Sequence, residues 1–186
     1  MEKRHINRVN TLRPHRANTP PPRQPFRPGW FEVTIRLLRS EIEYDVDFET
    51  YQVSGVSGAD AKGRFFLETS EKTADWMMRQ VDSAIEDIEA ALSAYSPRVS
   101  SRATTDEVPD NREWVINLMM EPGWRGDSKT MASLAHRFVV NYVLRAWYRM
   151  MDPKRYPLYD AEAEREKEKL VNVARSCDIK DVRFIL

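Results

Sequence analysis

The stretch KTMASLAHRFVVNYVLRAWYRMM, residues 129–151, decides the fold. Its apolar side chains recur every three or four residues, which is the spacing of one helix face. The main stripe consists of Met131, Leu134, Ala135, Phe138, Val139, Tyr142, Ala146, Trp147 and Met150, and Val140, Val143, Leu144 and Met151 widen it. Asp127 or Ser128 can cap the start, and Asp152-Pro153 ends the pattern. We therefore expect a helix over 129–151 that is central or contacts more than one neighbour.

A second amphipathic helix is predicted upstream, over residues 71–95. Its stripe consists of Met77, Val81, Ala84, Ile85, Ile88, Ala91, Leu92 and Tyr95, and its opposite face carries Asp82, Glu86, Asp87 and Glu89. Thr69 or Ser70 can cap it, and Pro97 ends it.

A third helix is predicted over residues 161–176, with Asp160 as its cap after the turn at Pro157. Its apolar stripe is narrow and consists of Ala163, Leu170, Val173, Ala174 and Cys177. Its charged face, expected to meet water, consists of Glu162, Glu164, Arg165, Glu166, Lys167, Glu168 and Lys169.

Short strands are expected around these helices. Residues 31–35 alternate apolar and polar side chains, and 114–120 (WVINLMM) read as a buried strand. Residues 37–48 fit either a strand or a helix, and we favour a short helix after a strand. Residues 54–64 read as a glycine-containing connection, 96–112 as a polar loop and 178–186 as an apolar strand that needs a partner. The expected fold class is mainly α: a small bundle with three principal helices (about 71–95, 129–151 and 161–176), a few short β-strands and extended termini.

The first 29 residues form a basic, proline-rich arm in front of a helical domain (30–177) and a C-terminal strand tail (178–186). The arm holds six of the eleven prolines, seven basic residues and one acid, so its net charge is +6, whereas residues 30–186 hold 22 bases and 28 acids. Because proline fixes φ and removes a donor, we expect an extended arm. It is either a solvated terminus or a segment that docks on an acidic partner, a neighbouring subunit or nucleic acid.

Composition excludes several classes of protein. The whole chain has 29 basic and 29 acidic residues, which is not the balance of a general polyanion binder. The single cysteine, Cys177, permits neither an internal disulfide nor a cysteine-based zinc cluster. No run approaches about 18 apolar residues, so no membrane span is expected. The first residues lack the apolar core of a secretory signal.

No catalytic, cofactor or metal motif is found, and we expect none of these sites. His5, His15 and His136 have no metal-ligand spacing, and His136 is expected to be solvated or locally bonded. Cys177 is expected to be a small core or interface residue. The methionine pairs at 77–78, 119–120 and 150–151 favour core filling over a docking surface. Trp30 and Trp124 stand beside glycine in presumed loops and are better interface candidates than Trp147.

The order of these elements resembles a known class of protein. An acidic helix ends in Tyr95-Ser96-Pro97, the strand EWVINL (113–118) follows, and LAHRFVVNYVLRAWY (134–148) precedes a charged last helix with Lys167 and Lys169. This is similar to small proteins encoded in the structural modules of bacterial prophages. In outline it also resembles the helical head–tail connector proteins (head-completion or neck adaptors) of tailed phages.

The resemblance implies a non-catalytic virion component that forms a ring of identical subunits below the portal, around the DNA channel, with portal and tail or neck proteins as partners. The residues expected to contact partners are Arg4, Arg8, Arg13, Arg16, Arg23, Arg27, Trp30, Trp124, Val182, Phe184, Ile185 and Leu186. Three alternatives stay open: a tail-completion protein, a nucleic-acid-binding regulator that uses the basic arm, and an enzyme with an unrecognised site.

Overall fold

The computed structural model describes residues 29–54, 71–96, 98–104 and 112–176. Their elements, in chain order, are β1 (Phe31–Leu38), α1 (Arg39–Ser54), α2 (Glu71–Leu92), β2 (Val99–Thr104), β3 (Glu113–Met120), α3 (Ser128–Met151) and α4 (Tyr156–Ala174). The predicted class, mainly helical with a few short strands, is confirmed. Predictions that lie outside the described residues are the arm, the connection at 55–64, the caps at Thr69 and Ser70, Cys177 and the strand at 178–186.

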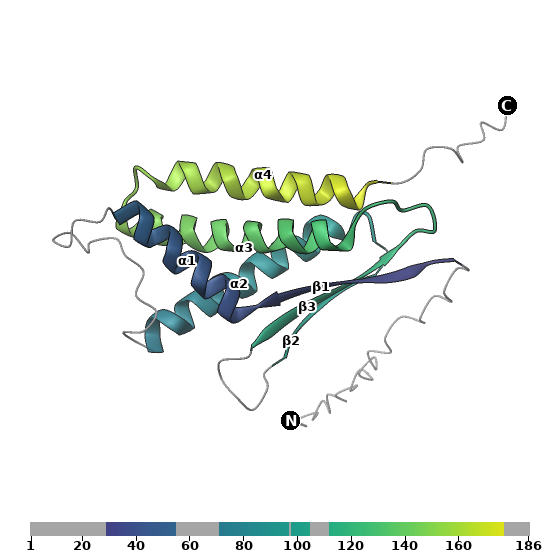
Figure 1. Cartoon of the computed structure of the whole chain (residues 1–186), viewed down its shortest axis with the longest axis horizontal. Coiled ribbons are helices and arrows are strands. Elements are labelled where there is room, and N and C mark those ends of the chain that lie inside the picture. The colour runs from purple at the N-terminus through teal and green to yellow at the C-terminus, as the bar shows by residue number, and fades with distance from the viewer. Residues whose placement is uncertain (1–28, 55–70, 97, 105–111, 177–186) are drawn as a thin grey trace, which may run out of the picture.

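The three strands form one antiparallel sheet in the order β1-β3-β2 (Figure 1). In β1, Val33, Ile35 and Leu37 are buried and alternate with exposed residues. They pair with Leu118, Ile116 and Trp114 of β3, in that order. Because side chains alternate between the faces of a sheet, this register gathers these six residues on one face, the face that meets the helices, whereas Val115 and Met119 of β3 lie on the other.

Helix α3 is the centre of the molecule. It packs against α4, α2, α1 and β1, and Figure 1 shows it between α4 and the sheet. Nine of its side chains are buried: Met131, Leu134, Ala135, Phe138, Val139, Val140, Val143, Leu144 and Tyr148. The prediction of a central helix with several neighbours is confirmed, and the wide apolar surface is explained by having the sheet on one side and α4 on the other.

Residues 37–48 form the end of a strand followed by a helix, as the sequence favoured. The alternative, a continuing strand, would have placed Ile42, Tyr44, Val46 and Phe48 on one face. Instead, Ile42 and Val46 are fully buried one helical turn apart, whereas Tyr44 and Phe48 are exposed. Helical spacing therefore decides which side chains of this segment enter the core.

The prediction of a loop over 96–112 is wrong for residues 99–104, which form β2. Val99, Ser101 and Ala103 lie on the helix-facing side of the sheet, opposite Leu118, Ile116 and Trp114. This strand carries little apolar surface, so its own pattern is weak. It forms because the second edge of β3 offers unpaired backbone groups.

The last helix begins five residues earlier than expected. Pro157 lies in the first turn of α4, where the missing N–H of proline costs no helical hydrogen bond. Asp160 is therefore inside the helix rather than its cap, and its carboxylate lies 3.2 Å from Arg145 of α3. The expectation that Glu166 meets water is also wrong, because buried positions recur along α4 at Tyr159, Ala163, Glu166, Leu170 and Ala174.

Asp127 caps α3, one of the two caps the sequence allowed. Its carboxylate accepts hydrogen bonds from the backbone N–H groups of Lys129 and Thr130 and from the Thr130 hydroxyl. The bond from that hydroxyl, followed by the backbone bond from Thr130, lowers the pKa of Asp127 below its usual value. The cap fixes the point at which the β3–α3 connection turns into the central helix.

Candidate functional site: the two ends of the fold

The points where residues 1–28 and 177–186 join the described fold lie at the same end of the molecule (Figure 1). Gly29 has a φ of +94°, a left-handed conformation that favours glycine. A Cβ at this position would lie 2.9 Å from Cγ of Pro122, in the connection between β3 and α3. The chain therefore enters β1 in close contact with that connection.

Trp124 ties the same connection to the end of α4. Its indole N–H donates a 2.9 Å hydrogen bond to the carbonyl of Val173, and the backbone N–H of Arg125 donates one of 2.7 Å to the carbonyl of Ser176. The Phe31 ring lies 5.9 Å from the Trp124 ring. We call this group (Gly29, Phe31, Pro122, Trp124 and Val173) the tail junction, because both terminal segments join the fold at it.

The structure therefore places two predicted interface residues, Trp30 and Trp124, at the end of the fold where the two terminal segments join it. Trp30 and Trp124 are both half-buried at this end, and the Trp124 indole is bonded within its own chain. A part of the Trp124 surface is thus already used in folding. The arginines of the arm and the apolar residues 182–186 lie outside the described residues, so their role as partner contacts stays a prediction.

The opposite end of the molecule exposes apolar side chains that sequence reasoning missed. Met150, Met151 and Leu158, at the turn from α3 to α4, are 58%, 48% and 59% exposed. The prediction that Met150 and Met151 fill the core is wrong, whereas Met77, Met78, Met119 and Met120 are buried. The reason is local: the chain turns at 152–155 directly after α3, and Tyr148 already occupies the inward side of its last turn.

The two ends are far apart. Helix α3 has 24 residues and runs from the tail junction to the exposed methionines. At 1.5 Å per residue it spans about 36 Å. The two ends of the molecule therefore differ: its terminal segments are attached at one end, and unpartnered apolar residues lie at the other. We call this difference between the ends the polarity of the fold.

Two stacked tyrosines lie under the exposed methionines. The rings of Tyr148 (α3) and Tyr159 (α4) are 4.9 Å apart and nearly parallel, and both are buried. Burial is the main cause that raises the pKa of Tyr148 well above its usual value of 10, and it also raises that of Tyr159. The charge of Glu49, on α1, acts in the same direction, whereas Arg155 opposes it.

These shifts predict loss of stability in alkaline solution. The unfolded chain ionises its tyrosines from about pH 10, whereas the folded chain holds these two neutral. Their contribution is therefore fully present below pH 10 and is lost as the pH rises above it. In urea titrations between pH 9 and 12, we expect Tyr148→Phe to flatten this fall in the free energy of unfolding. Tyr44→Phe, at an exposed position, should leave it unchanged; an equal slope in both variants would contradict the assignment.

His136 is the one histidine in the part of the chain that the structure describes. It lies on α3, and its Nε2 is 2.7 Å from the carboxylate of Asp45 on α1. Of the two expectations for this residue, solvated or locally bonded, the structure agrees with the second. Within the described ranges, no three histidine, cysteine, aspartate or glutamate side chains are grouped as a metal site would require.

An open groove of about 600 Å³ lies between the end of α2 and the start of β2, lined in part by Glu86, Glu89 and Arg98.

Comparison of the chain with protein-family models, with curated proteins and with solved structures finds no match. No helix in the part of the chain that the structure describes is long and apolar enough to cross a membrane. The features that define the candidate site are therefore its own geometry: the tail junction, the exposed apolar end and the polarity between them.

Proposed function

We propose that this protein is a non-catalytic structural subunit that assembles head to tail into a homo-oligomeric ring. We further propose that this ring is a head–tail connector of a phage virion, placed between the portal and the tail or neck proteins. The connector assignment is supported by the resemblance in helix order, and the self-assembly by the polarity of the fold. DNA passing through the channel of such a ring is the remaining partner in this proposal.

The observation that carries the proposal is the separation of the two ends. A contact between different surfaces of identical subunits is heterologous, and it closes into a ring when the rotation between subunits closes. Here one end of the fold carries both terminal segments, and the other exposes Met150, Met151 and Leu158. Apolar groups of this size, unpartnered in one subunit, are stabilised by burial against another.

Deleting residues 178–186 tests the assembly. We expect the full chain to show a defined oligomeric mass by light scattering and rings by negative-stain electron microscopy. The deletion should retain the helical circular dichroism, because α4 ends at Ala174, and should abolish the ring. The double substitution Asp181→Asn, Arg183→Gln keeps the apolar residues of the tail and should still assemble. Intact rings from the deleted chain would contradict the role of this tail.

The basic arm supports one alternative, a nucleic-acid-binding regulator. Seven bases in 29 residues would give a DNA affinity that falls steeply with salt. A chain that stays monomeric at every concentration and binds duplex DNA in this salt-dependent manner would favour the regulator over the connector.

A further inference from the structure

Helix α1 presents two aromatic rings to solvent. Tyr44 and Phe48 are 68% and 47% exposed, their ring centres are 6.2 Å apart and the rings are within 10° of parallel. The inward face of the helix is filled by Ile42, Val46 and Thr50, all fully buried. The two rings therefore contribute nothing to the core of one subunit, although they expose a large apolar surface.

Acidic side chains surround these rings. Residues 39–54 contain five acids (Glu41, Glu43, Asp45, Asp47 and Glu49) and one base, Arg39, which gives a net charge of −4. Glu41 precedes Tyr44 by three residues and Asp45 precedes Phe48 by three, so each ring has a carboxylate beside it on the helix surface. Glu43 is paired with Arg39, and Asp45 with His136, but Glu41 and Glu49 are exposed.

We propose that this face of α1, made of Glu41, Tyr44, Asp45 and Phe48, is the docking site for residues 1–28 of a second copy of the chain. The arm carries a charge of +6 and the segment PPPRQPFRP at 20–28, and the helix carries −4. Exposed aromatic rings are the surfaces on which proline rings pack and over which arginine guanidinium groups lie. The carboxylates beside them bind the same arginines.

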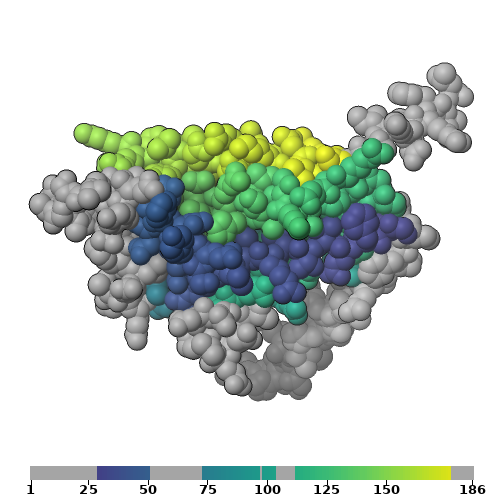
Figure 2. Space-filling view, in the orientation of Figure 1, coloured from purple at the N-terminus to yellow at the C-terminus, as the bar shows by residue number. Residues whose placement is uncertain are grey.

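The occupant is taken to be a second copy because the proposed ring needs a contact between subunits, and the site lies away from the arm's own point of attachment. The arm joins the fold at Gly29, in front of β1, whereas α1 starts only after β1 has ended. An eight-residue strand is about 26 Å long, and Figure 1 shows α1 continuing away from the arm's point of attachment. Figure 2 shows α1 at the molecular surface. An arm that reaches the next subunit gives the heterologous contact that ring closure requires.

This inference rests on the homo-oligomer of the proposed function, but not on its place in a virion. The first test measures docking without assembly. A fluorescent peptide of residues 1–28 is added to the full chain carrying Arg8→Glu, Arg13→Glu, Arg16→Glu and Arg23→Glu, so that its own arm does not compete. We expect saturable binding by fluorescence anisotropy at 50 mM salt, weakened at 500 mM salt.

We call the chain with these four arginine-to-glutamate substitutions the arm-reversed chain. In this chain, the further pair Tyr44→Ala, Phe48→Ala should weaken peptide binding about tenfold. The control Leu38→Ala removes an exposed apolar side chain at the end of β1, a residue that belongs to none of the proposed contacts, and should not change the binding. All three positions are exposed, so the circular dichroism of both variants should be that of the parent. Equal peptide affinity in the Tyr44/Phe48 variant and its parent would overturn the site.

The second test identifies the occupant. The arm-reversed chain keeps its α1 face, and a full chain with only Tyr44→Ala and Phe48→Ala keeps its arm; mixing them should give a one-to-one complex by light scattering. Monomers after mixing, despite peptide binding, would show that the arm docks on its own chain and would overturn the second copy. Rings of wild-type size formed by the chain with Tyr44→Ala and Phe48→Ala would overturn the docking of the arm on α1, but not the ring of the proposed function. If the peptide binds α1 but the wild-type chain does not self-associate, the result would instead contradict the ring of the proposed function.

Discussion

Replacing Trp114 by alanine is expected to lower the free energy of unfolding by about 3–5 kcal/mol. Trp114 is only 2% exposed and lies on β3, the central strand, where it pairs with Leu37 of β1. Removing the ring opens a large cavity between the sheet and the helices, and close-packed interiors collapse only partly around such a cavity. Urea denaturation followed by circular dichroism at neutral pH measures the change.

The indole also holds α2 against the sheet. Its N–H donates a 2.8 Å hydrogen bond to Asp82 of α2, and the Arg112 guanidinium, 5.0 Å from the ring centre, bonds the same carboxylate. Trp114→Phe keeps a six-membered ring at this position but loses the pyrrole ring with its N–H, so it should cost less than the alanine variant, about 1–3 kcal/mol. Equal stabilities of the alanine and phenylalanine variants would show that the hydrogen bond, rather than the ring, anchors this strand.

The position of Trp114 in a buried strand was predicted correctly, because the residues around it form a recognisable local pattern. A short apolar run that ends at Pro122-Gly123 indicates a buried strand whatever its neighbours are. The stripes of α2 and α3 are equally local, and most of their residues are buried, whereas Ala91, Tyr142, Ala146 and Trp147 are half-buried and Met150 is exposed. Propensity and periodicity suffice wherever one face of an element meets one continuous core.

Strand β2 and the start of α4 could not be predicted in the same way. β2 reads VSSRAT, and it is a strand because β3, distant in the sequence, supplies its hydrogen bonds. Proline indicates a helix start as readily as a turn, so Pro157 alone does not separate the two. In both cases the deciding partner belongs to another element.

The candidate site was predicted only in its residue types. Tryptophan beside glycine indicated Trp30 and Trp124, but the bond from Trp124 to Val173 joins residues 49 positions apart. The exposed pair Tyr44 and Phe48 was hidden in the ambiguity of 37–48, since a strand would have placed them beside Ile42 and Val46. Only the helix separates the buried and the exposed set.

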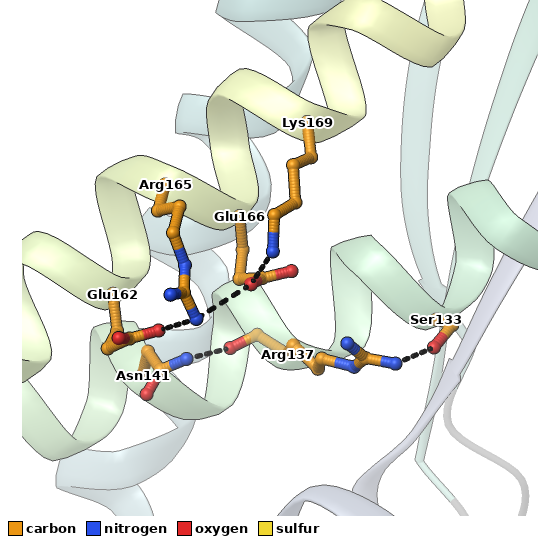
Figure 3. A network of polar contacts seen from close by, with 7 residues as sticks. All are labelled: Ser133, Arg137, Asn141, Glu162, Arg165, Glu166 and Lys169. Atoms are coloured by element: carbon orange, nitrogen blue, oxygen red, sulfur yellow. Dashed lines mark hydrogen bonds and ion pairs between the residues drawn. The ribbon is translucent and has the colours of Figure 1, made fainter.

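Glu166→Met is expected to raise the free energy of unfolding by about 1–4 kcal/mol. Glu166 is 2% exposed and lies between Ala163 and Leu170 in the stripe that α4 packs against α3. One carboxylate oxygen lies 2.6 Å from Nζ of Lys169 and 3.6 Å from the Arg165 guanidinium (Figure 3). The other oxygen is buried and has no hydrogen-bond partner within the described part of the chain.

The sign of this effect follows from the missing partner. Removing a carboxylate from water costs several kcal/mol, and the interaction with Lys169, itself half-exposed, offsets only a part of that cost. Figure 3 shows the Arg137 guanidinium of α3 directed toward Ser133, and its 3.3 Å bond to that hydroxyl leaves Glu166 without a cation from the facing helix. Methionine has a similar length, fills the same space and needs no partner.

Urea denaturation of Glu166→Met beside Glu168→Met tests this reasoning, because Glu168 is exposed on the same helix and its replacement should change stability by less than about 0.5 kcal/mol. A destabilised Glu166→Met chain would show that the Lys169 contact outweighs desolvation. If the stabilised variant also assembles as the wild type does, the buried charge has no part in the ring. If it is stable but monomeric, Glu166 holds α4 in the arrangement that the neighbouring subunit recognises, and stability has been exchanged for assembly.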